Sequence, residues 1–181
     1  MIIIVEGIDR VGKTTVAKKI SDEFGMKIFN NPYVNQEWVE LGKNKNGENI
    51  VNRKNAGPWN MFANIERMNV LLSFNEQFKC EDFIADRFHM SEYVYGVCDR
   101  QYANLDAFMN IDSRLSKLGA VIVYVKPKDI NWSSEQHGSD LRAHYRLFEK
   151  LVKITKCKVI KCNHDSLNSV VDKIKLEVNA L

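Results

Sequence analysis

Gly7-Ile8-Asp9-Arg10-Val11-Gly12-Lys13-Thr14 fills every fixed position of the pattern G-x-x-x-x-G-K-[ST]. The apolar run at residues 2–5 precedes this stretch and predicts a buried strand, and residues 13–24 have the spacing of an amphipathic helix that stops at Gly25. A strand that passes through such a turn into a helix is the context in which the pattern binds phosphate. Because a chance match with these flanks is rare, we predict a phosphate-binding loop rather than a simple connecting turn.

The chemistry of this loop follows from its residue types. Glycines let the backbone approach phosphate closely, successive N–H groups point inward, and the helix N-terminus adds a partial positive charge. Lys13 would bridge the β- and γ-phosphates of ATP, and Thr14 would offer its hydroxyl to Mg²⁺. The expected ATP-binding residues are Gly7, Ile8, Asp9, Arg10, Val11, Gly12, Lys13, Thr14 and Thr15. The loop predicts nucleotide binding and leaves kinase, switch GTPase and ATPase open.

Strand-like and helix-like segments alternate along the rest of the chain. The expected strands are 2–6, 26–29, 82–86, 121–125 and 157–162, and the expected helices are 13–24, a long one after Pro58, 103–118, 139–155 and one that closes the chain from Leu167. This alternation predicts an α/β fold of the P-loop NTPase type, with three αβα layers around a mostly parallel five-stranded sheet. We expect residues 1–181 to form a single domain with a short lid around 128–142.

Ligands of parallel sheets bind at the carboxyl ends of the strands, where Asp86 and Arg87 end an expected strand. Asp86 could orient Mg²⁺ or its waters, and the Arg87 guanidinium could form two hydrogen bonds to an acceptor phosphate. Arg10 lies inside the phosphate loop, where it would face the charge that develops on the γ-phosphate during transfer. The expected catalytic residues are Lys13, Arg10, Asp86 and Arg87, and the expected metal ligands are Thr14 and Asp86.

Residues 42–58 form a polar segment rich in asparagine and glycine. A polar stretch of this length inside a compact domain is usually a functional or mobile loop. We expect such a loop here and assign it no role.

Composition restricts the class of protein without choosing a function. The net charge of +3, from 26 Lys and Arg against 23 Asp and Glu, is too small and too scattered for a nucleic-acid-binding surface. No apolar run approaches the roughly 20 residues of a membrane helix, and the short apolar start lacks the features of a secretory signal. The four cysteines show neither C-x-x-C pairs nor metal spacing. We therefore expect a cytoplasmic protein with free thiols and no membrane or nucleic-acid partner.

Two segments resemble thymidylate kinases. The stretch Glu6 to Thr15 is similar to their E-G-x-D-x-x-G-K-[ST] loop, and Asp86 to Tyr95 resembles their D-R-[YFH]-x-x-S-x-x-A-Y segment, with Val94 in place of the small residue. Between them, residues 62–67 resemble the family helix that supplies an acceptor-site arginine. The order and approximate spacing agree over residues 1–100.

The resemblance implies a role for each matching residue. Asp9 would hold the sugar 3′-hydroxyl or position Mg²⁺, and Arg10 would be the catalytic arginine of a branch with few basic residues in its lid. Residues 131–140 contain no Arg or Lys, which agrees with that branch. Arg87 would bind the acceptor phosphate, and Tyr95 would pack against the sugar and favour deoxyribose. The expected acceptor-binding residues are Asp9, Phe62, Arg67, Arg87, Ser91 and Tyr95.

Several of these residues have an equally simple structural alternative. Tyr95 could be a core aromatic, Ser91 a helix-capping or packing residue, and Arg67 a surface residue that faces water. Two departures from the family also concern the acceptor side: no basic residue follows Pro32, and Phe62 stands one position away from the base-stacking aromatic. The donor side is intact.

Three functions remain open at this point. The first is ATP-dependent phosphoryl transfer to a deoxynucleoside monophosphate, with a dTMP-like acceptor favoured by the resemblance. The second is a kinase for the hydroxyl of a nucleoside or modified nucleotide, and the third is a non-catalytic nucleotide-binding protein. A switch GTPase is disfavoured because the chain has no N-K-x-D segment. The resemblance also implies a homodimer.

Overall fold

The structure is a computed structural model of the 181-residue chain. It describes residues 1–30, 40–43, 49–51, 53–78, 82–127, 141–163 and 167–178. The thirteen elements named below all lie within these ranges.

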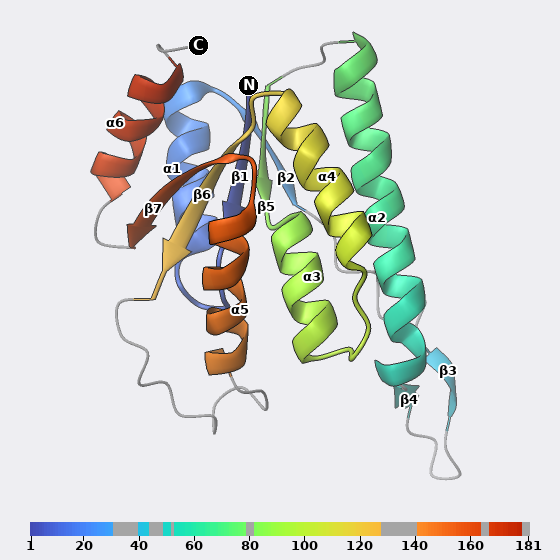
Figure 1. The fold of residues 1–181 in the computed structure, drawn as a ribbon. Coiled ribbons are helices and arrows are strands. Elements are labelled where there is room, and N and C mark those ends of the chain that lie inside the picture. Colours follow the sequence, from blue (N-terminus) through green and yellow to red (C-terminus); the bar gives the residue numbers. More distant parts are fainter. Residues whose placement is uncertain are drawn as a thin grey trace.

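A five-stranded parallel sheet lies at the centre of the molecule (Figure 1). Its strands, in spatial order, are β2 (Lys27–Asn30), β5 (Phe83–Asp86), β1 (Ile2–Glu6), β6 (Val121–Lys126) and β7 (Lys158–Asn163). Every residue of β1 and the first five residues of β6 are buried. Near-continuous runs of Ile and Val are typical of strands that are covered on both faces, and this explains why these two strands occupy central positions.

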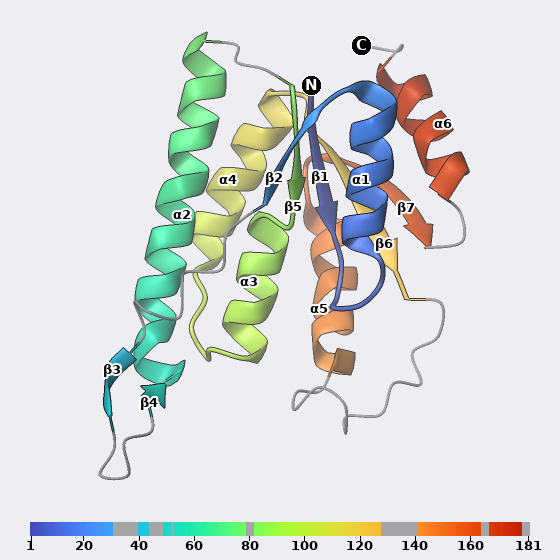
Figure 2. The same cartoon turned by 180° about the vertical axis from the view of Figure 1, so that it is seen from behind.

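Six helices cover the two faces of this sheet. They are α1 (Lys13–Phe24), α2 (Arg53–Phe78), α3 (His89–Cys98), α4 (Leu105–Lys117), α5 (Leu141–Ile154) and α6 (Leu167–Val178). Figures 1 and 2 show α1 and α6 on one face and α3, α4 and α5 on the other, where α2 lies outermost and packs on α3 and α4. The expected three-layer α/β architecture of the P-loop NTPase type is confirmed.

The strand ends that the sequence predicts to be functional lie at one edge of the sheet. In the parallel register Val5 is the partner of both Asp86 and Val123, so β1, β5 and β6 end close to one another. The loop after β1 and the Asp86-Arg87 turn after β5 therefore emerge side by side. This edge is the lower one in Figure 1, away from the end marked N.

Two expectations about the middle of the chain are wrong. The polar segment 42–58 is not one loop, because β3 (Glu40–Lys43) and β4 (Asn49–Val51) pair as an antiparallel two-stranded sheet. The long helix also begins at Arg53, before Pro58 rather than after it. Pro58 is the sixth residue of α2 and lacks the N–H that would donate to the carbonyl four residues earlier, so a proline in the sequence favours a boundary, yet the helix runs through it. Most of the expected lid, residues 128–140, lies outside the described residues.

Candidate active site

The backbone of the phosphate loop depends on two glycines. Gly7 has φ of 149°, and a Cβ atom there would lie 2.5 Å from the carbonyl oxygen of Val125 at the end of β6. Gly12 has φ of 87° and is the N-cap of α1. Side chains are excluded at the first position by contact and disfavoured at the second by conformation. The loop thus curls tightly around the N-terminus of α1, as phosphate binding requires.

Lys13 is buried beneath this loop, with 4% of its surface exposed. Its ammonium group donates a hydrogen bond to the carbonyl oxygen of Ile8. Burial, and then the positive charge of Arg87, lower the pKa of Lys13 to about 8, although Asp9, Asp86 and Glu6 act in the opposite direction. A buried cation with a weakened hold on its proton is typical of a functional site.

Thr14 and Asp86 meet across the end of the sheet. The Thr14 hydroxyl donates a 2.8 Å hydrogen bond to Asp86 Oδ2. Asp86 Oδ1 is buried and has no hydrogen-bond partner among the described residues. A hydroxyl beside a carboxylate with an uncommitted oxygen suits Mg²⁺, which binds through few protein oxygens and keeps its other positions for waters and phosphates. No cluster of three His, Cys, Asp or Glu side chains suited to a metal occurs in the part of the chain that the structure describes.

Asp9 and Arg87 form an ion pair between the phosphate loop and the turn after β5. Burial opposes ionisation of Asp9, but the charge and hydrogen bond of Arg87, with smaller effects of Lys13 and Tyr95, outweigh it and hold its pKa below the ordinary value. The Arg87 guanidinium also lies over the ring of Tyr95, 5.3 Å from the ring centroid, a cation–π distance. The structure therefore brings Asp9, Arg87 and Tyr95 together.

His144 joins this group from α5, and sequence reasoning missed it. Its ring packs against that of Tyr95 with centroids 5.0 Å apart, and its Nε2 lies 3.0 Å from Asp99 Oδ1 at the end of α3. Tyr95 thus has the Arg87 guanidinium and the His144 ring as neighbours. A lone histidine on a helix carries no signal for such a contact, because the contact arises only when α5 packs on α3.

Five further predicted residues lie at three places in the structure. Arg10 and Thr15 are exposed at the loop, and Arg10 has the left-handed φ of 61°. Ser91 is buried, and its hydroxyl donates a hydrogen bond to Glu6, which agrees with the packing alternative, while its contact to an acceptor stays a prediction. Arg67 and Phe62 are exposed on α2, and 58% of Phe62 is accessible. Their assignment to the acceptor site stays a prediction.

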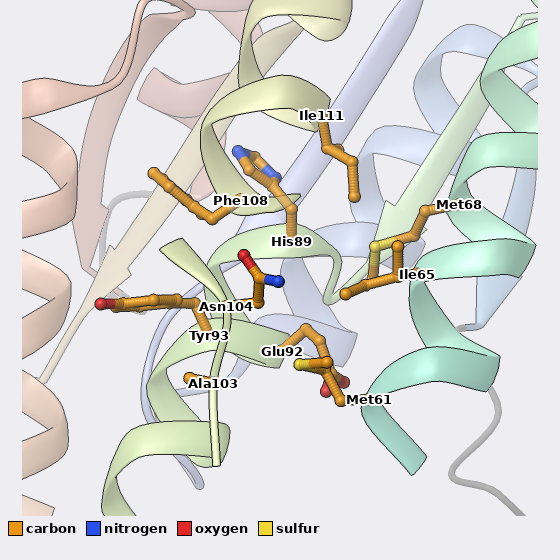
Figure 3. A pocket seen from close by; sticks show the side chains of 10 residues that line it. All are labelled: Met61, Ile65, Met68, His89, Glu92, Tyr93, Ala103, Asn104, Phe108 and Ile111. Carbon is orange, nitrogen blue, oxygen red and sulfur yellow. The ribbon is translucent and has the colours of Figure 1, made fainter. Parts of the chain in front are cut away.

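A narrow cavity lies between α2, α3 and α4, and Figure 3 shows the ten side chains around it. Its volume of about 10 Å³ has room for about one water molecule, so it cannot accept a nucleotide. Its polar residues are engaged within the protein: Glu92 accepts hydrogen bonds from Asn64 and Arg100, and His89 Nε2 lies 3.1 Å from Asp112. We regard this cavity as part of the core.

Known proteins resemble this chain in structure only. No family model matches the sequence, and no curated protein matches it. The YorR protein of Bacillus subtilis, solved in complex with phosphorylated GDP, is 21% identical over 99% of this chain and 96% of its own, with a TM-score of 0.66. A deoxyadenosine kinase from M. mycoides with bound dATP is 14% identical over 99% of this chain and 100% of its own, with a TM-score of 0.56. A thymidylate kinase from Ehrlichia chaffeensis is 15% identical over 96% of this chain and 98% of its own, with a TM-score of 0.57. These likenesses establish the fold.

Proposed function

We propose that this chain is a nucleotide kinase that transfers the γ-phosphoryl group of ATP to a deoxynucleoside monophosphate, with a dTMP-like acceptor as first candidate. The observation that carries the proposal is the convergence of Lys13 and Thr14 from the phosphate loop with Asp86 and Arg87 from the end of β5. The similar folds of a deoxyadenosine kinase and a thymidylate kinase support it.

Each residue of the group has a task in this reaction. Lys13 exchanges its hydrogen bond with the Ile8 carbonyl for the oxygens of the ATP phosphates. Arg10, exposed at the rim of the loop, neutralises charge that builds on the transferred group. Arg87 binds the acceptor phosphate, and Tyr95 flanks the sugar. A phosphate acceptor is already anionic, so positioning and charge neutralisation are sufficient and no strong base is needed.

Mg²⁺ belongs to this proposal because Thr14 and Asp86 fit it. The Thr14 hydroxyl and the uncommitted Oδ1 of Asp86 would hold the ion directly or through its waters. When bound, Mg²⁺ would neutralise negative charge on the phosphates of ATP.

One observation favours a second candidate function, transfer to a nucleoside hydroxyl. Asp9 places a carboxylate beside Arg87 at the same edge, and a hydroxyl acceptor gains from a nearby base. Because Arg87 is already paired with this carboxylate, its charge is partly compensated before any acceptor phosphate binds. The similar fold of the deoxyadenosine kinase is in line with this alternative.

An acceptor panel tests both functions. Purified protein with Mg-ATP would be offered dTMP, the other deoxynucleoside monophosphates and the deoxynucleosides, and ADP release would be measured. We expect stimulation by at least one monophosphate, with turnover of roughly 1–100 s⁻¹. Stimulation by nucleosides alone would replace the first function by the second. No stimulation by any acceptor, with ATP binding retained, would indicate a non-catalytic nucleotide-binding protein.

Lys13 predicts proton uptake when ATP binds. Its pKa of about 8 lies below the ordinary 10.5, so in the nucleotide-free protein this lysine loses its proton as the pH rises through about 8. Phosphates stabilise the ammonium form and return its pKa toward the ordinary value. Between about pH 8 and pH 10, binding of ATP should therefore take up a proton. Isothermal titration calorimetry at pH 9, in buffers of different ionisation enthalpy, measures this uptake.

The matched control is Lys13→Arg, because arginine keeps its charge throughout this range. If Lys13→Arg and the wild type took up equal numbers of protons, the low pKa of Lys13 would not be the source.

The same shift in the pKa of Lys13 makes the stability of the protein depend on pH. The unfolded chain binds the Lys13 proton more tightly than the folded protein does, so the free energy of unfolding increases with pH between about 8 and 10.5. The stability that Lys13 contributes is fully present above about pH 10.5 and is lost as the pH falls through about 8.

We also propose a homodimer formed through the outer face of α2. Four apolar residues, which we call the α2 outer stripe, are more than half exposed there: Phe62, Val70, Phe74 and Phe78. The opposite side of α2 is packed into the protein through the buried Met61, Met68 and Leu72, and one flank is fixed by Arg114 of α4, which donates hydrogen bonds to α2 side chains. The helix has 26 residues and is about 39 Å long, so two copies could cover one another along an extended line.

Light scattering coupled to size exclusion tests this dimer. We expect the wild type to elute with about twice the monomer mass, and Phe74→Glu/Phe78→Glu to elute as a monomer because two charges would be buried between the stripes. Leu176→Glu is the matched control, since Leu176 is 71% exposed on α6 at the other face of the sheet. A monomeric wild type at tens of micromolar would contradict this part of the proposal.

A cytoplasmic location is in line with these functions. Cys98, Cys157 and Cys162 are present as thiols, which reducing compartments maintain. Within the described residues, no helix combines the length and apolar character needed to cross a bilayer.

A further inference from the structure

Glu6 is a buried carboxylate that none of the functions above uses. It is the last residue of β1 and directly precedes Gly7 of the phosphate loop. None of its surface is exposed, and its backbone pairs with Tyr124 in the middle of the sheet. Burial of a carboxylate is unfavourable unless hydrogen bonds compensate for the lost water, so the partners of Glu6 must explain its presence.

Among the described residues, Glu6 accepts four hydrogen bonds, and all of them come from the start of α3. Oε1 accepts from the backbone N–H groups of Phe88 at 3.0 Å, Met90 at 3.1 Å and Ser91 at 3.3 Å. Oε2 accepts from the Ser91 hydroxyl. These contacts join residues that are more than eighty positions apart in the sequence.

The start of α3 lacks a cap of its own. Its N-cap residue is Phe88, which offers no side-chain oxygen, and no side-chain cap hydrogen bond is formed there. The first N–H groups of a helix have no partners within the helix, and an anion at that end is favoured by the helix dipole. Glu6 thus caps α3 from β1, which is a role that capping rules based on neighbouring residues cannot predict.

This cap adjoins the residue on which acceptor binding depends. Arg87 follows Asp86, which is the register partner of Val5 in β1. The N–H of Arg87 donates a 3.0 Å hydrogen bond to the Val5 carbonyl, and the next residue, Phe88, donates its N–H to Glu6. Arg87 has φ of 72°, a left-handed conformation that a residue with a side chain adopts only when its surroundings impose it. Hydrogen bonds to β1 on both sides of Arg87 provide that constraint.

We propose that Glu6 is a positioning residue that holds Arg87 in register with the phosphate loop. This inference rests on the proposed function, in which Arg87 binds the acceptor phosphate. Because Glu6 and Gly7 are consecutive, the loop that binds the donor and the turn that carries Arg87 are built on the same strand end. Acceptor and donor are thereby held in fixed relation without a direct contact between Glu6 and either one.

Three variants of the full chain test this role. Glu6→Ala removes the cap, Glu6→Gln keeps an oxygen acceptor and the shape of the side chain, and Ser91→Ala removes one of the four hydrogen bonds. Hydrogen–deuterium exchange would be followed at the amides of Phe88, Met90 and Ser91. We expect faster exchange by at least tenfold in Glu6→Ala, a smaller change in Ser91→Ala and near-wild-type exchange in Glu6→Gln. Unchanged exchange in both Glu6→Ala and Ser91→Ala would overturn the proposal.

Steady-state kinetics then separate positioning from general stability. We expect Glu6→Ala to lower kcat/KM for the acceptor by about 100-fold, with partial rescue by Glu6→Gln, and to have no further effect when Arg87 is already alanine. If the two effects multiplied instead, Glu6 would not act through Arg87 and the proposal would fail. Should Glu6→Ala not fold, the same cycle would be run with Ser91→Ala, for which we expect a several-fold loss.

Glu92→Gln is the matched control. Glu92 is also a buried carboxylate on α3, but it accepts hydrogen bonds from the side chains of Asn64 and Arg100 and not from the N–H groups at the start of α3. We expect its effect on kcat/KM to multiply with that of Arg87→Ala. Inactivity of the wild type with every acceptor would contradict the proposed function, and the exchange measurement, which needs no acceptor, would still decide whether Glu6 holds this turn.

Discussion

Replacing Lys13 by alanine is expected to lower kcat/KM for phosphoryl transfer by about 10³-fold, equivalent to about 4 kcal/mol of transition-state stabilisation. The physical reason is the place of this cation. Lys13 is buried beneath the phosphate loop, where a charge is poorly screened by water and acts strongly on the phosphates that the loop holds. The measurement is ADP release with the best acceptor from the panel.

The same substitution should not unfold the protein, and this separates a catalytic from a structural role. The lowered pKa of Lys13 means that its charge is unfavourable in the nucleotide-free protein. Lys13→Met keeps most of the buried stem without the charge, so we expect its melting temperature to equal or exceed that of the wild type. Lys18→Met, on an exposed position of α1, should leave both activity and melting temperature unchanged. A Lys13→Met protein with near-normal turnover would contradict the assigned role.

The donor half of the site could be predicted from sequence because its residues are consecutive. Lys13 and Thr14 are placed by the backbone that the two glycines of the loop permit, and that geometry needs no distant contact. The parallel sheet could be predicted as well, because runs of Ile and Val alternate with helical periodicity over the whole chain. The convergence of Asp86 with the loop follows from the parallel order alone, and the register of Val5 with Asp86 confirms it.

The contacts that hold the site together could not be predicted, because they depend on tertiary packing. Glu6 was visible as a charge at the end of an apolar strand, but its partner Ser91 is 85 residues away and is chosen by how β5 lies beside β1. His144 meets Tyr95 only because α5 packs on α3. Pro58 favours a helix that starts after it, whereas α2 starts at Arg53 and includes the proline.

Arg10→Ala is expected to reduce kcat by about 10³-fold, the lower end of the range for an arginine that neutralises charge in phosphoryl transfer. Arg10 is exposed at the rim of the phosphate loop and has φ of 61°. An exposed side chain contributes little to stability, so the melting temperature should stay unchanged. The left-handed backbone conformation, unusual for an arginine, is retained in the alanine variant, which therefore tests the guanidinium alone.

Two further variants decide whether charge or backbone is responsible. Arg10→Lys keeps a positive charge but not the planar fork that binds phosphate oxygens with two hydrogen bonds, so we expect partial activity. Arg10→Gly relieves the left-handed conformation and should be as inactive as Arg10→Ala while being at least as stable. Because Arg10 would act on the transition state and not on bound ATP, KM for ATP should change much less than kcat in all three. If Arg10→Ala kept near-normal kcat, charge neutralisation would have to come from Lys13 and Arg87 without a loop arginine.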